Sequence, residues 1–162
     1  MEIRKLTGKS LNKTQFAQMV EIEQNCGLEP YPPEVLLECI IFLDTFACFQ
    51  GNRLVGFVTM NPHGRYFGGS LYVVNINVAR AFRHRGIAKQ LLYAVYLYYV
   101  EGYENTPVSL DVTETNRAME RYREIGFRVS NLPSRNGDTD VVMSMLLKEM
   151  GRNLERLLEG KQ

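Results

Sequence analysis

The chain has 162 residues, enough for one domain with a substantial apolar core. Its 19 Lys and Arg residues nearly balance 18 Asp and Glu residues, so the net charge of +1 gives no overall attraction to nucleic acid or to a membrane. Cys26, Cys39 and Cys48 lie in apolar contexts without metal-ligand spacing, which is typical of reduced thiols. With no signal peptide and no bilayer-spanning apolar run, we expect a cytoplasmic protein.

The first third of the chain predicts one strand and two helices. Glu2–Leu6 can form the strand, and Asn12–Gln15 resembles a capping box ahead of apolar residues at helical spacing. Pro33 suits the first position of the second helix, which continues to about Leu43. The linker Gly27–Pro32 between the helices could shape a pocket rim or serve only as a connection.

Three strands and a long helix are predicted next. Thr45–Gln50 and Arg53–Met60 are apolar strands joined by the two-residue hairpin signal Gly51-Asn52. Ser70–Val78 is the third strand, and the helix after it reaches about Glu101 with an apolar face that suits packing on a sheet.

The remaining segments complete an α+β pattern with a mixed sheet. Val108–Thr113 is predicted as a strand, Asn116–Ile125 as a helix, and Phe127–Asn131 and Asp140–Leu146 as an antiparallel pair. We expect a domain over residues 1–147 and an amphipathic tail over residues 148–162. The apolar stripe of the tail could be covered by this domain or by a second copy in a homodimer; it comprises Met150, Leu154, Leu157 and Leu158.

A basic turn joins the strand that ends at Val78 to the long helix. The first N–H groups of a helix lack intrahelical partners and carry the positive end of its dipole, so such a turn can hold a phosphate. Gly86 would let the backbone approach a ligand, and positive charge is supplied by Arg80, Arg83, Arg85 and Lys89. One glycine instead of three disfavours a Rossmann NAD site. The alternative is a solvated basic helix start.

Two motifs resemble those of one family. Arg83–Ala88, with the pattern R-x-x-G-x-A, resembles the acyl-CoA pyrophosphate loop of the GCN5-related N-acetyltransferases (GNAT), written Q/R-x-x-G-x-G/A. Leu110–Phe127 resembles the strand–helix motif of the same family, L-E-V-x-x-x-N followed by A-x-x-x-Y-x-x-x-G-F. Ile22-Glu23-Gln24 followed by Pro32 most resembles the bacterial ribosomal-protein alanine N-acetyltransferases.

The resemblance implies a fold and a cofactor site. It implies a mostly antiparallel sheet of about six to seven strands, with flanking helices and a central parallel pair that splays apart. Backbone groups near the end of the first parallel strand would hold the pantetheine arm of acetyl-CoA, and the basic turn would hold its pyrophosphate. Because the gap to Ala118 is one residue shorter than usual, Thr115 competes with Asn116 for a cofactor-contacting position. The residues thereby implied to bind the cofactor are Ile76, Asn77, Val78, Arg83, His84, Arg85, Gly86, Ile87, Ala88, Lys89 and Asn116.

Two side chains are candidates for proton transfer, because forming an amide from a thioester requires a neutral amine and an acid for the leaving thiolate. Asp111 projects from the strand face opposite to its neighbours, and aspartate is depleted in strands, so it could be a general base or a structural carboxylate. Tyr122 lies on a helical stripe that alone indicates a core residue. The family places a tyrosine here as the acid that protonates the sulfur.

These features predict an acetyl-CoA-dependent N-acetyltransferase that acts by direct attack in a ternary complex, without a metal. The acceptor would be a primary amine: a protein N-terminus in the first interpretation, a small amine such as a polyamine or aminoglycoside in the second. The contrasting class is a non-catalytic acyl-CoA-binding module, against which the presence of Asp111 and Tyr122 argues.

Overall fold

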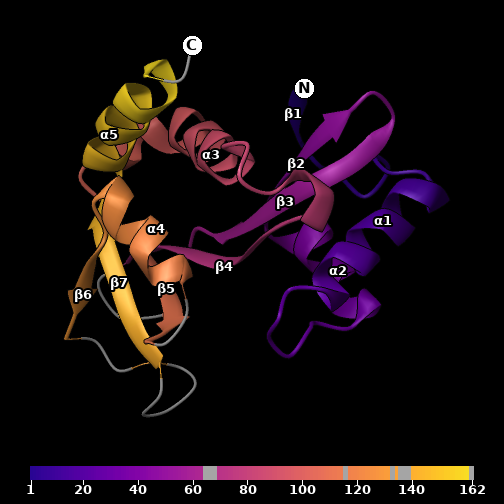
Figure 1. Cartoon of the computed structure of the whole chain (residues 1–162), viewed down its shortest axis with the longest axis horizontal. Helices are drawn as coiled ribbons and strands as arrows, with labels where there is room; N and C mark the ends of the chain where they lie inside the picture. Colours follow the sequence, from indigo (N-terminus) through magenta and orange to yellow (C-terminus); the bar gives the residue numbers. More distant parts are fainter. Residues whose placement is uncertain (64–68, 115–116, 132–133, 135–139, 161–162) are drawn as a thin grey trace. The chain divides into compact units, whose positions relative to one another are not determined.

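The structure, a computed structural model, describes residues 1–63, 69–114, 117–131, 134 and 140–160, and its elements are labelled in Figure 1. Seven strands form a mixed sheet in the order β1-β2-β3-β4-β5-β7-β6, which confirms the predicted α+β class. The chain divides into two compact units. Unit 1 comprises Met1–Asn61 and Val74–Val95, and unit 2 comprises Pro62–Val73 and Tyr96–Gln162.

Two elements begin in one unit and continue in the other. The strand β4 (Leu71–Val78) starts in unit 2 and ends in unit 1, whereas the helix α3 (Ile87–Tyr103) starts in unit 1 and ends in unit 2. The backbone of α3 is interrupted near its end, where Gly102 has a φ of 95°. The end of this helix was predicted there.

Unit 1 contains the elements predicted for the first third of the chain and the hairpin after it. The capping box is present, because Gln15 N–H donates to the Asn12 side chain and Asn12 N–H donates to the Gln15 side chain. Pro33 occupies the first position of its helix. The strands pair antiparallel, β1 with β2 and β2 with β3. The bounds are β1 (Glu2–Lys5), α1 (Lys13–Gln24), α2 (Pro33–Phe42), β2 (Asp44–Gln50) and β3 (Arg53–Asn61).

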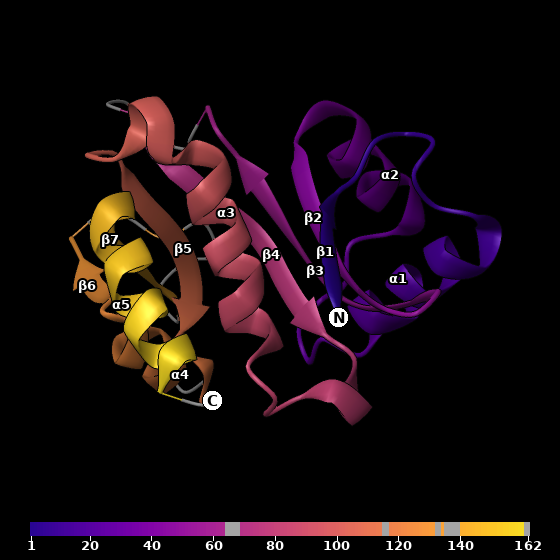
Figure 2. The ribbon, with the colours of Figure 1, turned by 90° about the horizontal axis from the view of Figure 1, so that it is seen from above.

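Helices cover both faces of the strands in unit 1. In Figure 2, α1 and α2 lie on one side of β2 and β3, and the first part of α3 lies on the other. The apolar cluster on the α1 and α2 side is buried and includes Met19, Leu36, Phe49 and Phe57. On the other side, a Cβ at Gly56 would lie 3.2 Å from the Asn77 carbonyl oxygen and 3.3 Å from Ile87 Cγ2. The end of β4 and the start of α3 therefore pack closely on β3.

Unit 2 contains the predicted parallel pair. Leu71 and Tyr72 of β4 pair in parallel with Val108 and Ser109 of β5, and β7 pairs antiparallel with both β5 and β6. The splay of β4 and β5 stays a prediction. The remaining elements of this unit are β5 (Pro107–Thr113), α4 (Ala118–Ile125), β6 (Arg128–Ser130), β7 (Asp140–Leu146) and α5 (Leu147–Glu159).

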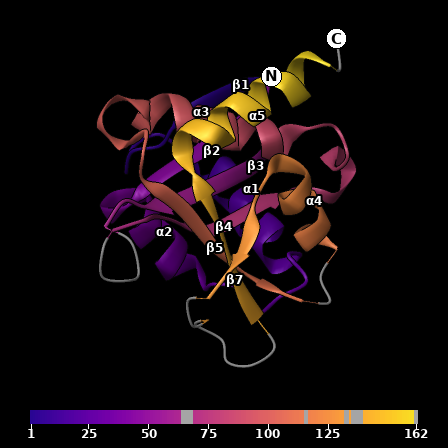
Figure 3. The same ribbon diagram turned by 90° about the vertical axis from the view of Figure 1, so that its left-hand side faces the viewer.

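The C-terminal helix α5 packs on α4 and β7 of its own unit (Figure 3). Met150 and Leu154 are fully buried, whereas Leu157 and Leu158 are half-buried. A Cβ at Gly151 would lie 2.3 Å from the Tyr96 ring, so helix and ring are in close contact. This chain therefore covers much of the stripe itself; the separation of residues 148–162 as a tail stays a prediction. None of the described helices is both long and apolar enough to cross a bilayer.

Candidate active site

The basic turn precedes α3 in unit 1. A single 3-10 turn covers Arg80–Phe82, and α3 begins at Ile87. Between them, His84 and Gly86 have positive φ angles of 65° and 79°. A positive φ is uncommon for a residue other than glycine, and left-handed residues in a turn can aim successive N–H groups to one side as an anion nest.

The space in front of this turn is open. Apart from Gly86 itself and its two neighbours in the chain, no described residue has an atom within 4 Å of the position that a Gly86 Cβ would take. The Gln90 N–H donates to the Gly86 carbonyl at 3.0 Å, so Gly86 lies at the start of α3, the end of a helix that carries the positive pole of its dipole. His84, Arg85 and Ala88 are exposed, whereas Lys89 is half-buried and Ile87 is buried. The turn thus has the geometry of an anion site.

Arg83 holds the turn in place. Its Nε donates to the Val78 carbonyl at 3.0 Å, and its Nη2 donates to the Asn25 carbonyl at 3.2 Å. The guanidinium therefore ties the end of β4 to the end of α1. The motif predicts that the charge of Arg83 contacts the pyrophosphate. The two carbonyl partners could not be predicted from the sequence, because Asn25 is distant along the chain and Val78 lies on the preceding strand.

Further arginines gather beside the turn. The buried ring of Phe82 has the guanidinium of Arg85 at 5.1 Å from its centroid and that of Arg53 at 5.6 Å. A hollow of about 220 Å³ borders the turn and is lined by Glu21, Ile22, Asn25, Arg53, Val78, Ala79, Arg80, Ala81 and Arg83. Three guanidinium groups against one carboxylate make this hollow basic. Arg53 was not predicted, because it lies on a strand far from the motif.

The segment Ile76–Val78, implied by the resemblance to hold the pantetheine arm, forms the end of β4 in unit 1. All three residues are half-buried. Asn116, the further predicted cofactor contact, and its competitor Thr115 lie outside the described residues.

Asp111 lies on β5 in unit 2, half-buried between the buried Leu110 and Val112. The hydroxyl of Tyr72, on β4, donates to Asp111 Oδ2 at 2.6 Å. The pairing of Tyr72 with Ser109 explains this contact, since Ser109 and Asp111 share one face of their strand. A short hydrogen bond to a charged group fixes the orientation of the carboxylate. Sequence reasoning missed Tyr72, whose strand reads as an apolar run.

Tyr122 lies on α4 in unit 2. Its ring packs edge-to-face on Phe127, with centroids 5.8 Å apart at an interplanar angle of 71°. Burial raises the pKa of Tyr122 to about 12, while the charge of Arg121 acts in the opposite direction. An unperturbed phenol has a pKa of about 10, so Tyr122 is a weaker acid than an ordinary tyrosine and stays protonated well above neutral pH.

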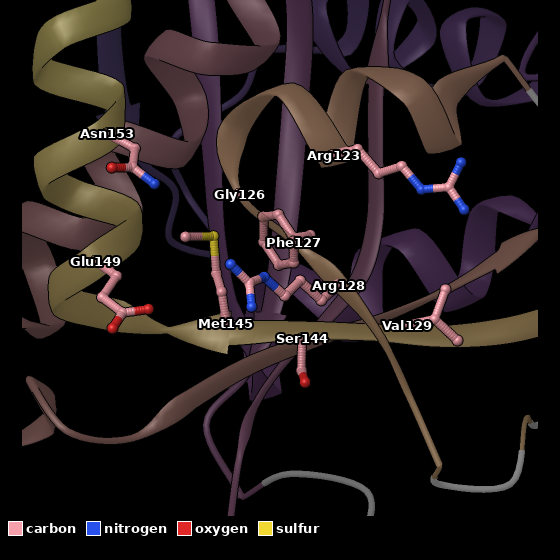
Figure 4. Close-up of a pocket in the computed structure, with 9 residues that line it drawn as sticks. All are labelled: Arg123, Gly126, Phe127, Arg128, Val129, Ser144, Met145, Glu149 and Asn153. Carbon is pink, nitrogen blue, oxygen red and sulfur yellow. The ribbon is translucent and has the colours of Figure 1, made fainter.

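A second hollow lies in unit 2, and none of the predicted site residues lines it. It has a volume of about 630 Å³. Figure 4 shows Asn153 and Glu149 of α5 on one side, Arg123 of α4 on the other, and Phe127 and Met145 between them. The lining contains neither Asp111 nor Tyr122, so we assign it no part in the reaction. Among the residues that the structure describes, no three His, Cys, Asp or Glu side chains are placed to hold a metal ion.

Comparisons with known proteins agree with these features. The model of the acetyltransferase (GNAT) family matches residues 16–127. The N-terminal acetyltransferase A complex catalytic subunit ard1 of Schizosaccharomyces pombe is 28% identical over 130 residues, covering 69% of this chain and 70% of that protein.

Solved structures share the fold. The ribosomal-protein-S18-alanine N-acetyltransferase from Escherichia coli has a TM-score of 0.67 at 18% identity, covering 90% of this chain and 93% of that one. Aminoglycoside 6'-acetyltransferase type Ii has a TM-score of 0.70 at 18% identity, covering 91% and 97%. At such identities, these structures indicate the fold alone.

Proposed function

Because the chain belongs to the acetyltransferase (GNAT) family, we propose that it transfers the acetyl group of acetyl-CoA to the α-amino group of a protein N-terminus. That it is an acetyl-CoA-dependent acetyltransferase follows from the family. The choice of acceptor rests on one observation, the 28% identity to the catalytic subunit of an N-terminal acetyltransferase complex. The cysteines of this chain are free thiols, which suits a reducing compartment, and we propose that the protein is located in the cytoplasm.

The turn from Arg83 to Lys89 is the proposed pyrophosphate site. Open space at Gly86, the left-handed backbone of His84 and Gly86, and the helix start all suit an anion. Arg53 and Arg80 add positive charge beside the turn. We assign the pantetheine arm to the backbone of Ile76–Val78 and a further contact to Asn116.

The reaction joins the amine nitrogen to the acetyl carbon and breaks the carbon–sulfur bond of the thioester. The amine must lose a proton, and the thiolate of coenzyme A must gain one. We assign the first step to Asp111, directly or through a water, with Tyr72 holding its carboxylate by the 2.6 Å hydrogen bond. We assign the second step to Tyr122, a phenol that carries its proton at neutral pH.

A small amine is the second candidate acceptor, because the aminoglycoside acetyltransferase shares the fold at a TM-score of 0.70. The fold therefore does not choose between the two classes.

Release of coenzyme A, measured with acetyl-CoA and matched acceptors, tests the choice. The acceptors are short peptides with a free N-terminus, the same peptides with a blocked N-terminus, spermidine and an aminoglycoside. We expect turnover with free peptides and loss of it on blocking, with the added acetyl group located on the α-amine by mass spectrometry. Turnover with only the small amines would contradict the proposal. An absence of turnover with every amine, despite acetyl-CoA binding, would support the non-catalytic module.

A further inference from the structure

The second hollow, in unit 2, has the size and the lining of a small-molecule site. Its volume of about 630 Å³ lies within the range of about 300–1,000 Å³ that is typical of ligand pockets. Phe127 and Met145 line it and are both buried, so part of its surface is apolar. Ligand pockets combine such a surface with a few polar groups that orient the ligand. The charged side chains around the hollow therefore indicate what it can hold.

Three charged side chains from three elements line the hollow. Arg123 lies on α4, Arg128 on β6 and Glu149 on α5. Figure 4 shows Glu149 on one side and Arg123 on the other, with Arg128 between them. All three residues are exposed, and no ion pair joins any of them to another residue that the structure describes. Two positive charges and one negative charge are therefore available to a ligand.

Hydrogen bonds hold the walls of the hollow together. Asn153 Nδ2, on α5, donates to the Ile125 carbonyl at the end of α4 at 2.8 Å, and Asn153 Oδ1 accepts from Arg156 Nη2. The contact is close, because a Cβ at Gly126 would lie 2.7 Å from Asn153 Nδ2. Glu149 lies one helical turn before Asn153, so the same bond fixes the place of Glu149 relative to the end of α4. The hollow is therefore preformed.

The wall formed by Gly126 and Phe127 also contacts Tyr122. The N–H groups of Gly126 and Phe127 both donate to the Tyr122 carbonyl, at 3.1 Å and 3.0 Å. The Phe127 ring packs edge-to-face on the Tyr122 ring. A ligand that packs on Phe127 therefore lies one side chain away from Tyr122, and its binding restrains the end of α4.

The signs of the three charges select the class of ligand. A simple anion would face the Glu149 carboxylate, and a simple ammonium would face two guanidinium groups. A molecule with one amine and two carboxylates matches every charge. Guanidinium groups suit carboxylates, because their planar donors can bind both oxygens.

We propose that this hollow binds an acidic α-amino acid, such as glutamate, at a site that none of the residues predicted to bind acetyl-CoA lines. The α-amine pairs with Glu149, the α-carboxylate with Arg128 and the side-chain carboxylate with Arg123. The methylene groups of the ligand pack on Phe127 and Met145. This inference goes beyond the proposed function, and it holds whether the chain acetylates peptides or small amines.

Isothermal calorimetry with three ligands tests the partner of each charge. L-Glutamate carries all three groups, 2-oxoglutarate lacks the amine, and L-glutamine lacks the side-chain carboxylate. Glu149→Gln should raise the Kd of glutamate about fivefold, as for one partly exposed charge pair, without raising that of 2-oxoglutarate. Arg123→Gln should raise the Kd of glutamate by a similar factor without raising that of glutamine. These ratios between ligands do not depend on the fraction of folded protein.

The matched controls are Arg152→Gln and Glu159→Gln, which remove exposed charges of α5 that do not line the hollow. Both should keep the parent Kd for each ligand. Amide hydrogen exchange gives a second readout. Glutamate should slow exchange at Gly126 and Phe127 in the parent, because the ligand restrains the end of α4, and it should not do so in Arg128→Gln/Glu149→Gln.

Three results would overturn the proposal. The first is the absence of measurable glutamate binding to the parent. The second is a parent-like Kd in Arg123→Gln, Arg128→Gln and Glu149→Gln, because the ligand would then bind elsewhere, for example as an acceptor. The third is an equal loss of affinity in these variants and in the Arg152→Gln and Glu159→Gln controls. A lack of acetyl transfer to every amine would contradict the proposed function alone.

Discussion

Two substitutions at Gly86 can separate the effect of negative charge at the basic turn from the effect of side-chain size. We predict that Gly86→Glu loses acetyl-CoA binding, whereas Gly86→Gln, of nearly the same size, retains most of it. The φ of 79° strains any side chain equally in both variants, at about 1–2 kcal/mol. The open space around the glycine accommodates either side chain. Only the charge then differs between the two.

The magnitude follows from the proximity of the new carboxylate to the pyrophosphate. Two like charges about 4 Å apart near a protein surface repel by about 4 kcal/mol, and salt reduces this value. A net loss of about 2–4 kcal/mol raises the Kd of acetyl-CoA by about 30- to 1,000-fold.

Isothermal calorimetry of acetyl-CoA binding to parent, Gly86→Glu and Gly86→Gln measures this difference, and thermal unfolding checks the fold. We expect equal melting temperatures for the two variants, slightly below that of the parent. Equal Kd values for the two variants would refute the electrostatic argument, because strain or bulk would then explain any loss. A parent-like Kd for Gly86→Glu would show that the basic turn does not bind the pyrophosphate of acetyl-CoA.

Three further predictions concern other parts of the molecule. Gly151→Ala should lower the free energy of unfolding by about 1–3 kcal/mol, because its Cβ would lie 2.3 Å from the Tyr96 ring; denaturant unfolding measures this. Tyr72→Phe should lower kcat/KM by about tenfold, because the Asp111 carboxylate loses the bond that orients it; steady-state kinetics measure this. Cys39 should resist thiol reagents at neutral pH, because burial and nearby carboxylates raise its pKa to about 11; labelling followed by mass spectrometry measures this.

Each of these has an outcome that would contradict it. Gly160→Ala is the control for Gly151, since its Cβ would meet only ordinary contacts; equal stability losses would argue against the clash with Tyr96. Tyr72→Phe with unchanged kinetics would make the Tyr72–Asp111 bond structural only. If Cys39 in the folded protein is labelled as fast as the half-buried Cys26, the prediction is wrong, and α2 opens often enough to expose the thiol.

Local signals in the sequence predicted the elements well. The capping box at Asn12, the proline at position 33 and the Gly51-Asn52 turn act through neighbouring backbone atoms, so each can be read over a few residues. The basic turn before α3 could be predicted for the same reason. Its left-handed residue His84 could not, because no local preference requires it.

The partners of the site residues could not be read from the sequence. Tyr72 and Asp111 are 39 residues apart, and Glu23 and Asn77 are 54 residues apart. Which of these side chains meet depends on strand order and register, which a single sequence does not determine. The partners of Arg83 could not be predicted either. Its charge suggested a contact with a ligand, whereas in the folded protein its guanidinium donates to two main-chain carbonyls.

In the proposed reaction, Tyr122 supplies the proton to the departing thiolate. Because burial raises the pKa of Tyr122 to about 12, the phenol should remain a donor across the neutral range, and the stability that its protonated form provides should be lost only as the pH rises from about 10 to about 12.

The direct measurement is kcat of Tyr122→Phe between pH 6 and 9. In this range the phenol of the parent is protonated, because its pKa lies above the range. The variant keeps the ring that packs on Phe127 and deletes only the hydroxyl. We predict a fall in kcat of about 10²–10⁴-fold with the Kd of acetyl-CoA nearly unchanged. A kcat within a few-fold of the parent across this range would show that Tyr122 is a packing residue and that the proton comes from elsewhere.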